Sequence, residues 1–177
     1  MPIPMDITFE PLIPKMVPLY CEVGMQSYQE HYVQLWENGD PYPFYEENLT
    51  VKAVSEGLKN PKQFFYIIHS QKVPIGVLKL SLDVPFGKEV PLENILINKI
   101  YLLKAHTGKG LGNKCLLFAE QFAKDHHRKC IWLYTMKKGR AKQFYLKHGY
   151  IIFGESEVTF PGILEEEKEM WVMKKLP

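Results

Sequence analysis

The residues with the clearest chemical potential form a glycine-rich run at 107–113, between a long apolar stretch and a helical pattern. Alternate glycines let a backbone turn tightly and bring its N–H groups within reach of a bound phosphate. Where a helix begins at such a turn, its N-terminus adds roughly half a positive charge. The run therefore predicts a pyrophosphate site made of Thr107, Gly108, Lys109, Gly110, Leu111, Gly112 and Asn113.

The spacing of this run differs from two common phosphate-binding loops. No Gly-Lys-Ser/Thr sequence closes it, so it is not a Walker A loop. Asn113 stands where a G-x-G-x-x-G motif needs its last glycine. A glycine turn with a purely structural role is the alternative interpretation.

A second chemical pattern combines acidic and aromatic residues near the N-terminus. Carboxylates attract a cationic amine, and aromatic faces add a cation–π attraction of about 0.5–2 kcal/mol. A polyamine or a lysine-like cation would suit such a surface, although aromatic residues at helical spacing are also typical of a core. The residues are Tyr28, Glu30, Tyr32, Trp36, Asp40, Tyr42, Tyr45, Glu46 and Glu47.

The charges are unevenly distributed along the 177-residue chain, although its net charge is only +2. Residues 1–60 carry 9 acidic and 3 basic side chains, a net −6, whereas residues 101–150 carry 2 acidic and 11 basic ones, a net +9. Such a pattern fits a protein that holds one anionic and one cationic ligand, or simply solvated helix faces. The basic stretch also allows a nucleic-acid-binding module, but no recognised RNA- or DNA-reading motif accompanies it, and we expect no nucleic-acid partner.

These residues must be positioned by a single α/β domain spanning residues 1–177, by the usual length prior. The patterns predict the order β-α-α-β-β-β-α-β-α-β-β, and therefore one mixed sheet with helices on both faces. The expected strands cover 5–12, 63–69, 73–84, 95–103, 129–135, 150–158 and 169–173, with 63–69 and 73–84 forming an antiparallel hairpin. The expected helices run to about 36, over 48–59, from 111 and over 139–148, with a turn-rich segment at 37–44.

The cysteine content and the chain start predict a cytoplasmic protein. Cys21, Cys115 and Cys130 are odd in number and lack Cys-x-x-Cys spacing, so neither a disulfide framework nor a metal site is expected. The first residues lack a basic segment followed by an apolar run, and no stretch of about 18 uncharged apolar residues occurs. We expect neither secretion nor membrane contact.

Residues 95–150 resemble the cofactor-binding part of the GNAT superfamily of N-acetyltransferases. The glycine run is followed at the right separation by AKQFYLKHGY, which matches the pattern A-x-x-F-Y-x-K-x-G-F/Y at every defined position. Weaker similarity, including residues 27–32 and 64–66, extends over nearly the whole chain and resembles bacterial spermidine/spermine acetyltransferases of the sporulation-regulator type.

The resemblance implies a fold, a co-substrate and a set of site residues. The two central strands of the mostly antiparallel sheet are expected to splay apart around acetyl-CoA. Ile100 and Leu102 then offer backbone groups to the pantetheine and thioester, and residues 107–113 hold the pyrophosphate. Tyr145 falls on the tyrosine that the family places beside the sulfur, so it is the expected proton donor to the departing thiolate. Further cofactor contacts are expected from Tyr101, Lys138 and Lys147.

Three departures from the family pattern affect these predictions. Thr107 replaces the usual Gln or Arg, and Lys138 or Gly139 replaces an asparagine ahead of the last helix, where Lys138 and Arg140 could supply charge instead. Many relatives carry a glutamate that acts as the general base in the stretch that Leu96 and Asn98 occupy here. The remaining hypothesis is that ordered water, assisted by Glu30 or His31, removes the proton from the ammonium of the acceptor.

The acceptor is therefore predicted to bind at Tyr28, Glu30, His31 and Tyr32. Because the glutamate is missing, a catalytically silent acyl-CoA sensor is an alternative to an enzyme. The acceptor itself stays open among polyamines, protein N-termini, lysine side chains and antibiotic amines. The resemblance also allows a homodimer.

Overall fold

The computed structural model describes residues 6–88 and 90–177 and contains one seven-stranded sheet with the order β1-β2-β3-β4-β5-β7-β6. All neighbouring strands are antiparallel except β4 and β5, which are parallel. The expected hairpin of β2 and β3 is confirmed. The strands are β1 (Ile7–Pro11), β2 (Gln63–Ser70), β3 (Val73–Leu82), β4 (Asn94–Leu102), β5 (Cys130–Met136), β6 (Ile151–Glu157) and β7 (Glu169–Lys175).

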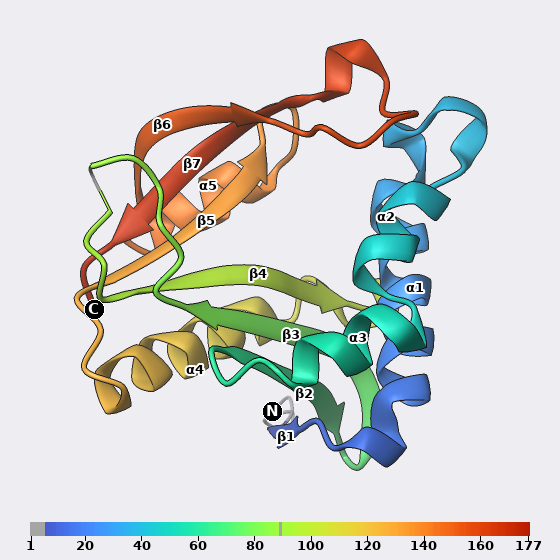
Figure 1. Cartoon of the computed structure of the whole chain (residues 1–177), viewed down its shortest axis with the longest axis horizontal. Coiled ribbons are helices and arrows are strands. Elements are labelled where there is room, and N and C mark those ends of the chain that lie inside the picture. Colours follow the sequence, from blue (N-terminus) through green and yellow to red (C-terminus); the bar gives the residue numbers. More distant parts are fainter. Residues whose placement is uncertain (1–5, 89) are drawn as a thin grey trace.

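The helices cover both faces of the sheet (Figure 1). Residues of α4 and α5 pack in the core on one face, and residues of α1 and α3 pack in the core on the other. The predicted α/β fold is thereby confirmed. The helices are α1 (Val17–Tyr32), α2 (Tyr42–Asn48), α3 (Val51–Leu58), α4 (Leu111–Asp125) and α5 (Ala141–Lys147). Short 3-10 turns are η1 (Pro14–Met16), η2 (Val33–Leu35), η3 (Glu37–Gly39), η4 (Lys104–His106) and η5 (Glu165–Glu167).

The helix expected over 48–59 is present as α3, but a further helix, α2, was missed at the end of the segment 37–44, which was expected to be turn-rich. Helix α2 begins inside the expected turn at Tyr42, because Pro43 occupies its first turn, where the missing N–H costs nothing. It ends at Asn48, and the second helix starts only after Thr50, whose hydroxyl accepts a hydrogen bond from Ala53 N at 3.2 Å. Of the strand expected over 5–12, residue 5 lies outside the described residues.

The two central strands diverge, as the resemblance implied. β4 and β5 pair only over Asn94–Leu96 and Cys130–Trp132. Figure 1 shows the two strands close together at this end and increasingly separated toward α1 and α2. Beyond Leu96, the edge of β4 that faces β5 has no strand partner among the described residues, so its backbone groups are open to a ligand with donors and acceptors of its own.

Asn94 holds the paired end of the two strands together. It is fully buried, and its Oδ1 accepts hydrogen bonds from the indole N–H of Trp132 at 2.9 Å and from Val84 N at 3.2 Å. Its Nδ2 donates to the carbonyls of Val84 at 2.9 Å and Pro91 at 2.8 Å. The side chain therefore joins β4, β5 and the loop after β3 at the vertex of the divergence.

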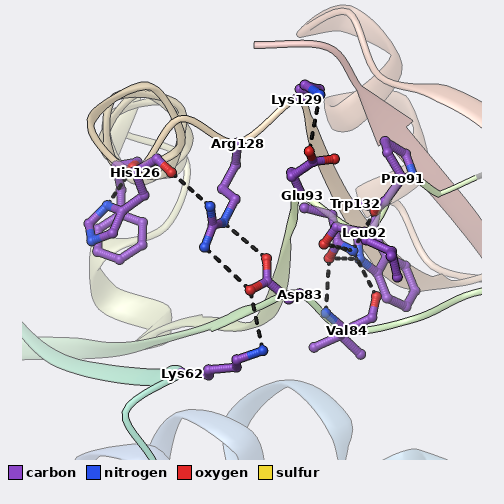
Figure 2. Close-up of polar contacts among 12 residues, drawn as sticks. Lys62, Asp83, Val84, Pro91, Leu92, Glu93, His126, Arg128, Lys129 and Trp132 are labelled. Atoms are coloured by element: carbon purple, nitrogen blue, oxygen red, sulfur yellow. Dashed lines mark hydrogen bonds and ion pairs between the residues drawn. The ribbon is translucent and has the colours of Figure 1, made fainter.

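Ion pairs fix the same loop from outside (Figure 2). Arg128, which follows α4, lies 3.0 Å from Asp83, and Lys62 lies 3.4 Å from the same carboxylate. Lys129 pairs with Glu93 at 3.1 Å. Each exposed pair contributes little stability in water, but together they fasten the segment before β4 to the segment before β5.

A β-bulge in β4 decides which side chains face which helices. Leu80 of β3 pairs with Ile97 and the next residue back, Lys79, pairs with Lys99, so Asn98 is the extra residue. In a regular strand, side chains two positions apart share a face. Because of the bulge, Ile97 and Ile100, which are three positions apart, both pack in the core beneath α4. Lys99 is thereby moved to the opposite face, which α1 and α2 cover.

Among the described residues, none of the helices combines the length and apolar character that crossing a membrane requires.

Candidate functional site

A cavity of about 810 Å³ opens where β4 and β5 diverge. Its wall includes residues of α1, α2, β4, β5 and α5 and of the segment between β6 and β7. The β4 contribution is continuous, from Ile97 through Asn98, Lys99 and Ile100 to Tyr101. The remaining lining residues that enter the argument are Tyr28, His31, Tyr32, Phe44, Lys138, Arg140, Tyr145, Glu157 and Glu167.

The backbone of β4 turns alternate residues toward this cavity. Leu103 N donates to Ile75 O on β3 at 2.8 Å, so the residues one and three positions earlier direct their peptide groups to the opposite edge. These residues are Leu102 and Ile100, the pair predicted to bind pantetheine. The carbonyl of Leu102 already accepts a hydrogen bond from His31 Nε2 at 2.9 Å. Ile100 is therefore the better placed of the two to orient a ligand along the strand edge.

The glycine loop and the start of α4 present open backbone amides. Gly108 and Gly110 have φ values of 73° and 75°, in the left-handed region that favours glycine, and Gly110 is the N-cap of α4. The first-turn N–H groups of Leu111, Gly112 and Asn113 have no acceptor inside the helix. The loop is exposed, and nothing lies within 4 Å of the point where a Cβ would stand on Gly108 or Gly110. An anionic group thus has both room and donors at this position.

Two polar side chains of the predicted loop are used within the loop itself. The hydroxyl of Thr107 donates to Lys104 O at 2.8 Å, and Lys109 Nζ donates to Ala105 O at 2.9 Å. The Thr107 hydroxyl therefore has no hydrogen left to donate to a phosphate. Lys109 can reach a phosphate only by breaking its exposed hydrogen bond to Ala105 O. The backbone amides carry more of the predicted binding than the side chains.

Tyr145 lines the cavity from α5, on the side of the sheet that α4 covers. Burial, followed by the nearby Tyr32 and Cys115, raises the pKa of the Tyr145 phenol above its ordinary value. A phenol with a raised pKa keeps its proton throughout the neutral range, so it can donate a proton but is a poor base. This arrangement fits the predicted donor role.

Three of the four residues predicted to bind the acceptor line the cavity. His31 and Tyr32 line the cavity. Tyr28 also borders it, but its hydroxyl accepts from Trp36 Nε1 at 3.0 Å and its ring stacks on Phe44, so it serves the core as well.

Glu30, predicted to bind the acceptor, is exposed and is not part of the cavity wall. Its Oε2 accepts from Lys104 N at 2.6 Å and so holds the turn before the glycine loop. This hydrogen bond lowers the pKa of Glu30, which makes its carboxylate a weaker base. Asp40, Glu46 and Glu47 likewise lie outside the wall.

The carboxylates and cations that do border the cavity come from other segments. Glu157 at the end of β6 and Glu167 in η5 line it, and Glu167 pairs with Lys138 at 3.3 Å. Of the two lysines predicted to contact the cofactor, Lys138 lines the cavity, whereas Lys147 is exposed on α5 and does not line it. The sequence analysis missed Glu157 and Glu167, because nothing in the sequence around them shows that this C-terminal segment lies beside β4 and β5.

Lys99 is a further cavity residue that the sequence analysis did not single out. Only 4% of it is exposed, and its Nζ donates to Asn48 Oδ1 at 2.9 Å. Phe44 lies with its ring centre 5.7 Å from the same nitrogen. The one signal in the sequence was a lysine inside an otherwise apolar strand.

Comparison of the sequence with known proteins gives two consistent matches. The profile of the acetyltransferase (GNAT) family matches residues 24–150. The chain is also 25% identical over 142 residues to an uncharacterized N-acetyltransferase from the pepI 3′ region of Lactobacillus delbrueckii subsp. lactis, covering 80% of this chain and 82% of that protein.

Solved structures share the fold. The PaiA N-acetyltransferase of Thermoplasma acidophilum, crystallised in complex with coenzyme A, superposes with a TM-score of 0.73 at 18% identity, over 98% of this chain and 100% of that chain. A mutant of spermidine N-acetyltransferase SpeG from Vibrio cholerae gives a TM-score of 0.69 at 16% identity, over 96% and 93% of the two chains. At these identities the structural likeness concerns the fold alone.

Proposed function

We propose that this chain transfers the acetyl group directly to a primary amine bound in the cavity. The premise is that the chain belongs to the acetyltransferase (GNAT) family and is an N-acetyltransferase with acetyl-CoA as its co-substrate. The observation that carries this proposal is the cavity between the diverging β4 and β5. It has the free edge of β4 on one wall and Tyr145 on another.

The residues present fit the co-substrate. The open amides at the start of α4 suit its pyrophosphate, and the outward-turned peptide of Ile100 suits the amide groups of its pantetheine arm. A bound thioester supplies an acyl carbon that an amine can attack without further activation. The protein then has to bring the two groups together and exclude competing water, which is where most of the rate enhancement arises.

The proposed roles follow from position. A backbone N–H on the free edge of β4 supports the negative charge that develops on the thioester oxygen during attack. Tyr145 donates its phenolic proton to the departing sulfur. A donor role is supported by the cavity position of Tyr145 and by the raised pKa of its phenol.

A polyamine is the narrower proposal for the acceptor, as the resemblance to spermidine/spermine acetyltransferases of the sporulation-regulator type implies. It is supported by Glu157 and Glu167, whose carboxylates border the cavity and can pair with the second or third ammonium of a linear polyamine. It no longer rests on Glu30. Cys21, Cys115 and Cys130 are buried free thiols, which fits the cytoplasmic location we propose for this reaction.

A thiol-release assay with acetyl-CoA and a panel of amines tests both levels of the proposal. The panel contains spermidine, spermine, an aminoglycoside, a basic peptide and neutral primary amines. Release of thiol together with an acetylated amine, identified by mass, is the expected result. Thiol release without acetylated product, or none with any amine, would contradict direct transfer.

The Glu157→Gln variant provides the check on the polyamine. We expect it to raise KM for spermidine and to leave KM for a monoamine unchanged, because only the longer substrate carries an additional charge for this carboxylate. Equal effects on both substrates would argue against a polyamine site at Glu157.

A further inference from the structure

The cavity contains one buried cation-forming group that the proposed reaction has not used. Lys99 reaches the cavity only because the bulge at Asn98 turns it onto the face that α1 and α2 cover. Within the part of the chain that the structure describes, its Nζ donates a hydrogen bond to a neutral amide oxygen, Asn48 Oδ1. Among the described residues, no carboxylate lies within ion-pair distance of Lys99. A buried lysine without a counter-ion is costly to keep charged.

The surroundings of Lys99 add a like charge rather than an opposite one. Lys79 lies directly across the sheet on β3, where it pairs in register with Lys99. Burial first, and Lys79 second, lower the pKa of Lys99 to about 7. The other titratable or charged groups that border the cavity are Tyr28, His31 and Tyr32 of α1, Tyr101 of β4, Tyr134 of β5, Tyr145 of α5, and Lys138, Arg140, Glu157 and Glu167.

The reaction needs a proton acceptor of this kind. A primary alkylammonium, with a pKa near that of lysine at about 10.4, is almost entirely protonated at neutral pH and has no lone pair for attack. Glu30 lies outside the cavity wall, and Nε2 of His31 is occupied as a donor to Leu102 O. Lys99 and Tyr145 lie on opposite faces of the sheet. One can therefore take a proton on the amine side while the other delivers a proton on the sulfur side.

We propose that Lys99, as its neutral amine, is the group that removes a proton from the ammonium of the acceptor substrate. This inference rests on the proposed function. The ammonium gives one proton to Lys99 Nζ, and the resulting amine forms the C–N bond to the acetyl carbon. As the C–S bond breaks, the sulfur takes the proton of Tyr145, and Tyr145 is reprotonated by the second proton that the new amide nitrogen loses. Lys99 releases its proton to solvent, so one proton is released for each amide formed.

The test is the pH dependence of kcat/KM for wild type and Lys99→Met, with the best amine from the panel. Wild type should rise through an ionisation near neutral pH, because a group with a lowered pKa becomes a competent base above that pKa. Lys99→Met should lose that ionisation and fall by about 10²-fold at neutral pH, within the range typical of general bases. The deficit should shrink as the pH approaches about 10, where the substrate arrives already neutral. A purely structural role would not produce this recovery.

Two further variants sharpen the result. Lys99→Arg keeps the positive charge but cannot accept a proton, so it should behave like Lys99→Met. Lys79→Met is the matched control, since Lys79 does not line the cavity. Removing its charge should raise the pKa of Lys99 and move the wild-type ionisation to higher pH with an unchanged plateau. Calorimetric affinity for CoA should be the same in all variants.

Particular outcomes would overturn the inference. A Lys99→Met enzyme that retains the neutral ionisation, or whose deficit is the same at every pH, shows that another group takes the proton. Mass spectrometry that finds the acetyl group on Lys99 itself during turnover would make it a nucleophile. In the first case, acetylation of the amine by wild type would leave the proposed function intact. An acetyl group on Lys99 would also contradict direct transfer to the amine, although the protein would still be an N-acetyltransferase. A wild-type enzyme that acetylates no amine would remove the proposed function and this inference with it.

Discussion

Replacing Tyr145 by phenylalanine removes a single hydroxyl from the cavity and leaves the ring in place. The ring packs against Phe144 and Tyr150, with centres 5.3 and 5.6 Å away, and neither contact needs the oxygen. The Tyr145 hydroxyl makes no hydrogen bond to another described residue, so the fold should lose well under about 1 kcal/mol. The variant therefore isolates the chemistry from the packing.

The expected loss is set by proton donation to the sulfur. A well-placed general acid is worth roughly 10²- to 10⁴-fold in rate, which corresponds to about 3–5 kcal/mol of activation free energy. We expect the lower end, because a thiolate is a good leaving group and water can protonate it slowly. The loss should appear in kcat, whereas affinity for acetyl-CoA should remain unchanged, because the hydroxyl contributes to neither the glycine loop nor the edge of β4.

The assay combines steady-state thiol release with calorimetric titration of CoA. The raised pKa of Tyr145 adds a pH criterion. A donor whose pKa is raised stays protonated past the ordinary tyrosine range, so wild-type kcat should not decline through about pH 10 from loss of this proton. An unchanged kcat in Tyr145→Phe would remove Tyr145 from the mechanism. A loss confined to CoA affinity would make it a binding residue.

Three other substitutions test parts of the structure that serve the site. Gly110→Ala should weaken CoA binding by about tenfold. An alanine at φ 75° costs about 1–2 kcal/mol in the left-handed conformation, so the loop will relax away from that conformation. An unchanged Kd for CoA in calorimetry would contradict this. Asn94→Ala should lower the free energy of unfolding by about 3 kcal/mol, because the Trp132 and Val84 groups that it satisfies stay buried, as denaturant titration can measure. Glu30→Gln should leave KM for the amine unchanged and slightly weaken CoA binding through the turn at Lys104; a raised KM for the amine would restore Glu30 to the acceptor site.

Local patterns predicted most of the elements because the responsible interactions are themselves local. Two β-rich runs separated by a short polar segment predicted the β2–β3 hairpin, and the helical period beginning at Leu111 predicted α4. The segment around Tyr42 was misassigned, because turn-forming residues such as Pro41 and Pro43 are equally compatible with the first turn of a helix. Tertiary contacts, such as the packing of Phe44 on Tyr28 and the hydrogen bond from the Tyr45 hydroxyl to Met25 O, favour the helix there.

The sequence by itself determined the features whose physical cause lies within a few residues: the glycines that turn the backbone ahead of α4, and the tyrosine carried by α5. Tertiary structure alone decided which charged groups meet in the cavity. The bulge at Asn98 arises from pairing with β3 and moves Lys99 to the other face of the sheet. Glu157 and Glu167 reach the cavity from the C-terminal part of the chain, and Glu30 turns away to bind a backbone amide. Burial and charge proximity depend on long-range contacts, so the sequence could not show that Lys99, Glu157 and Glu167 border the same cavity.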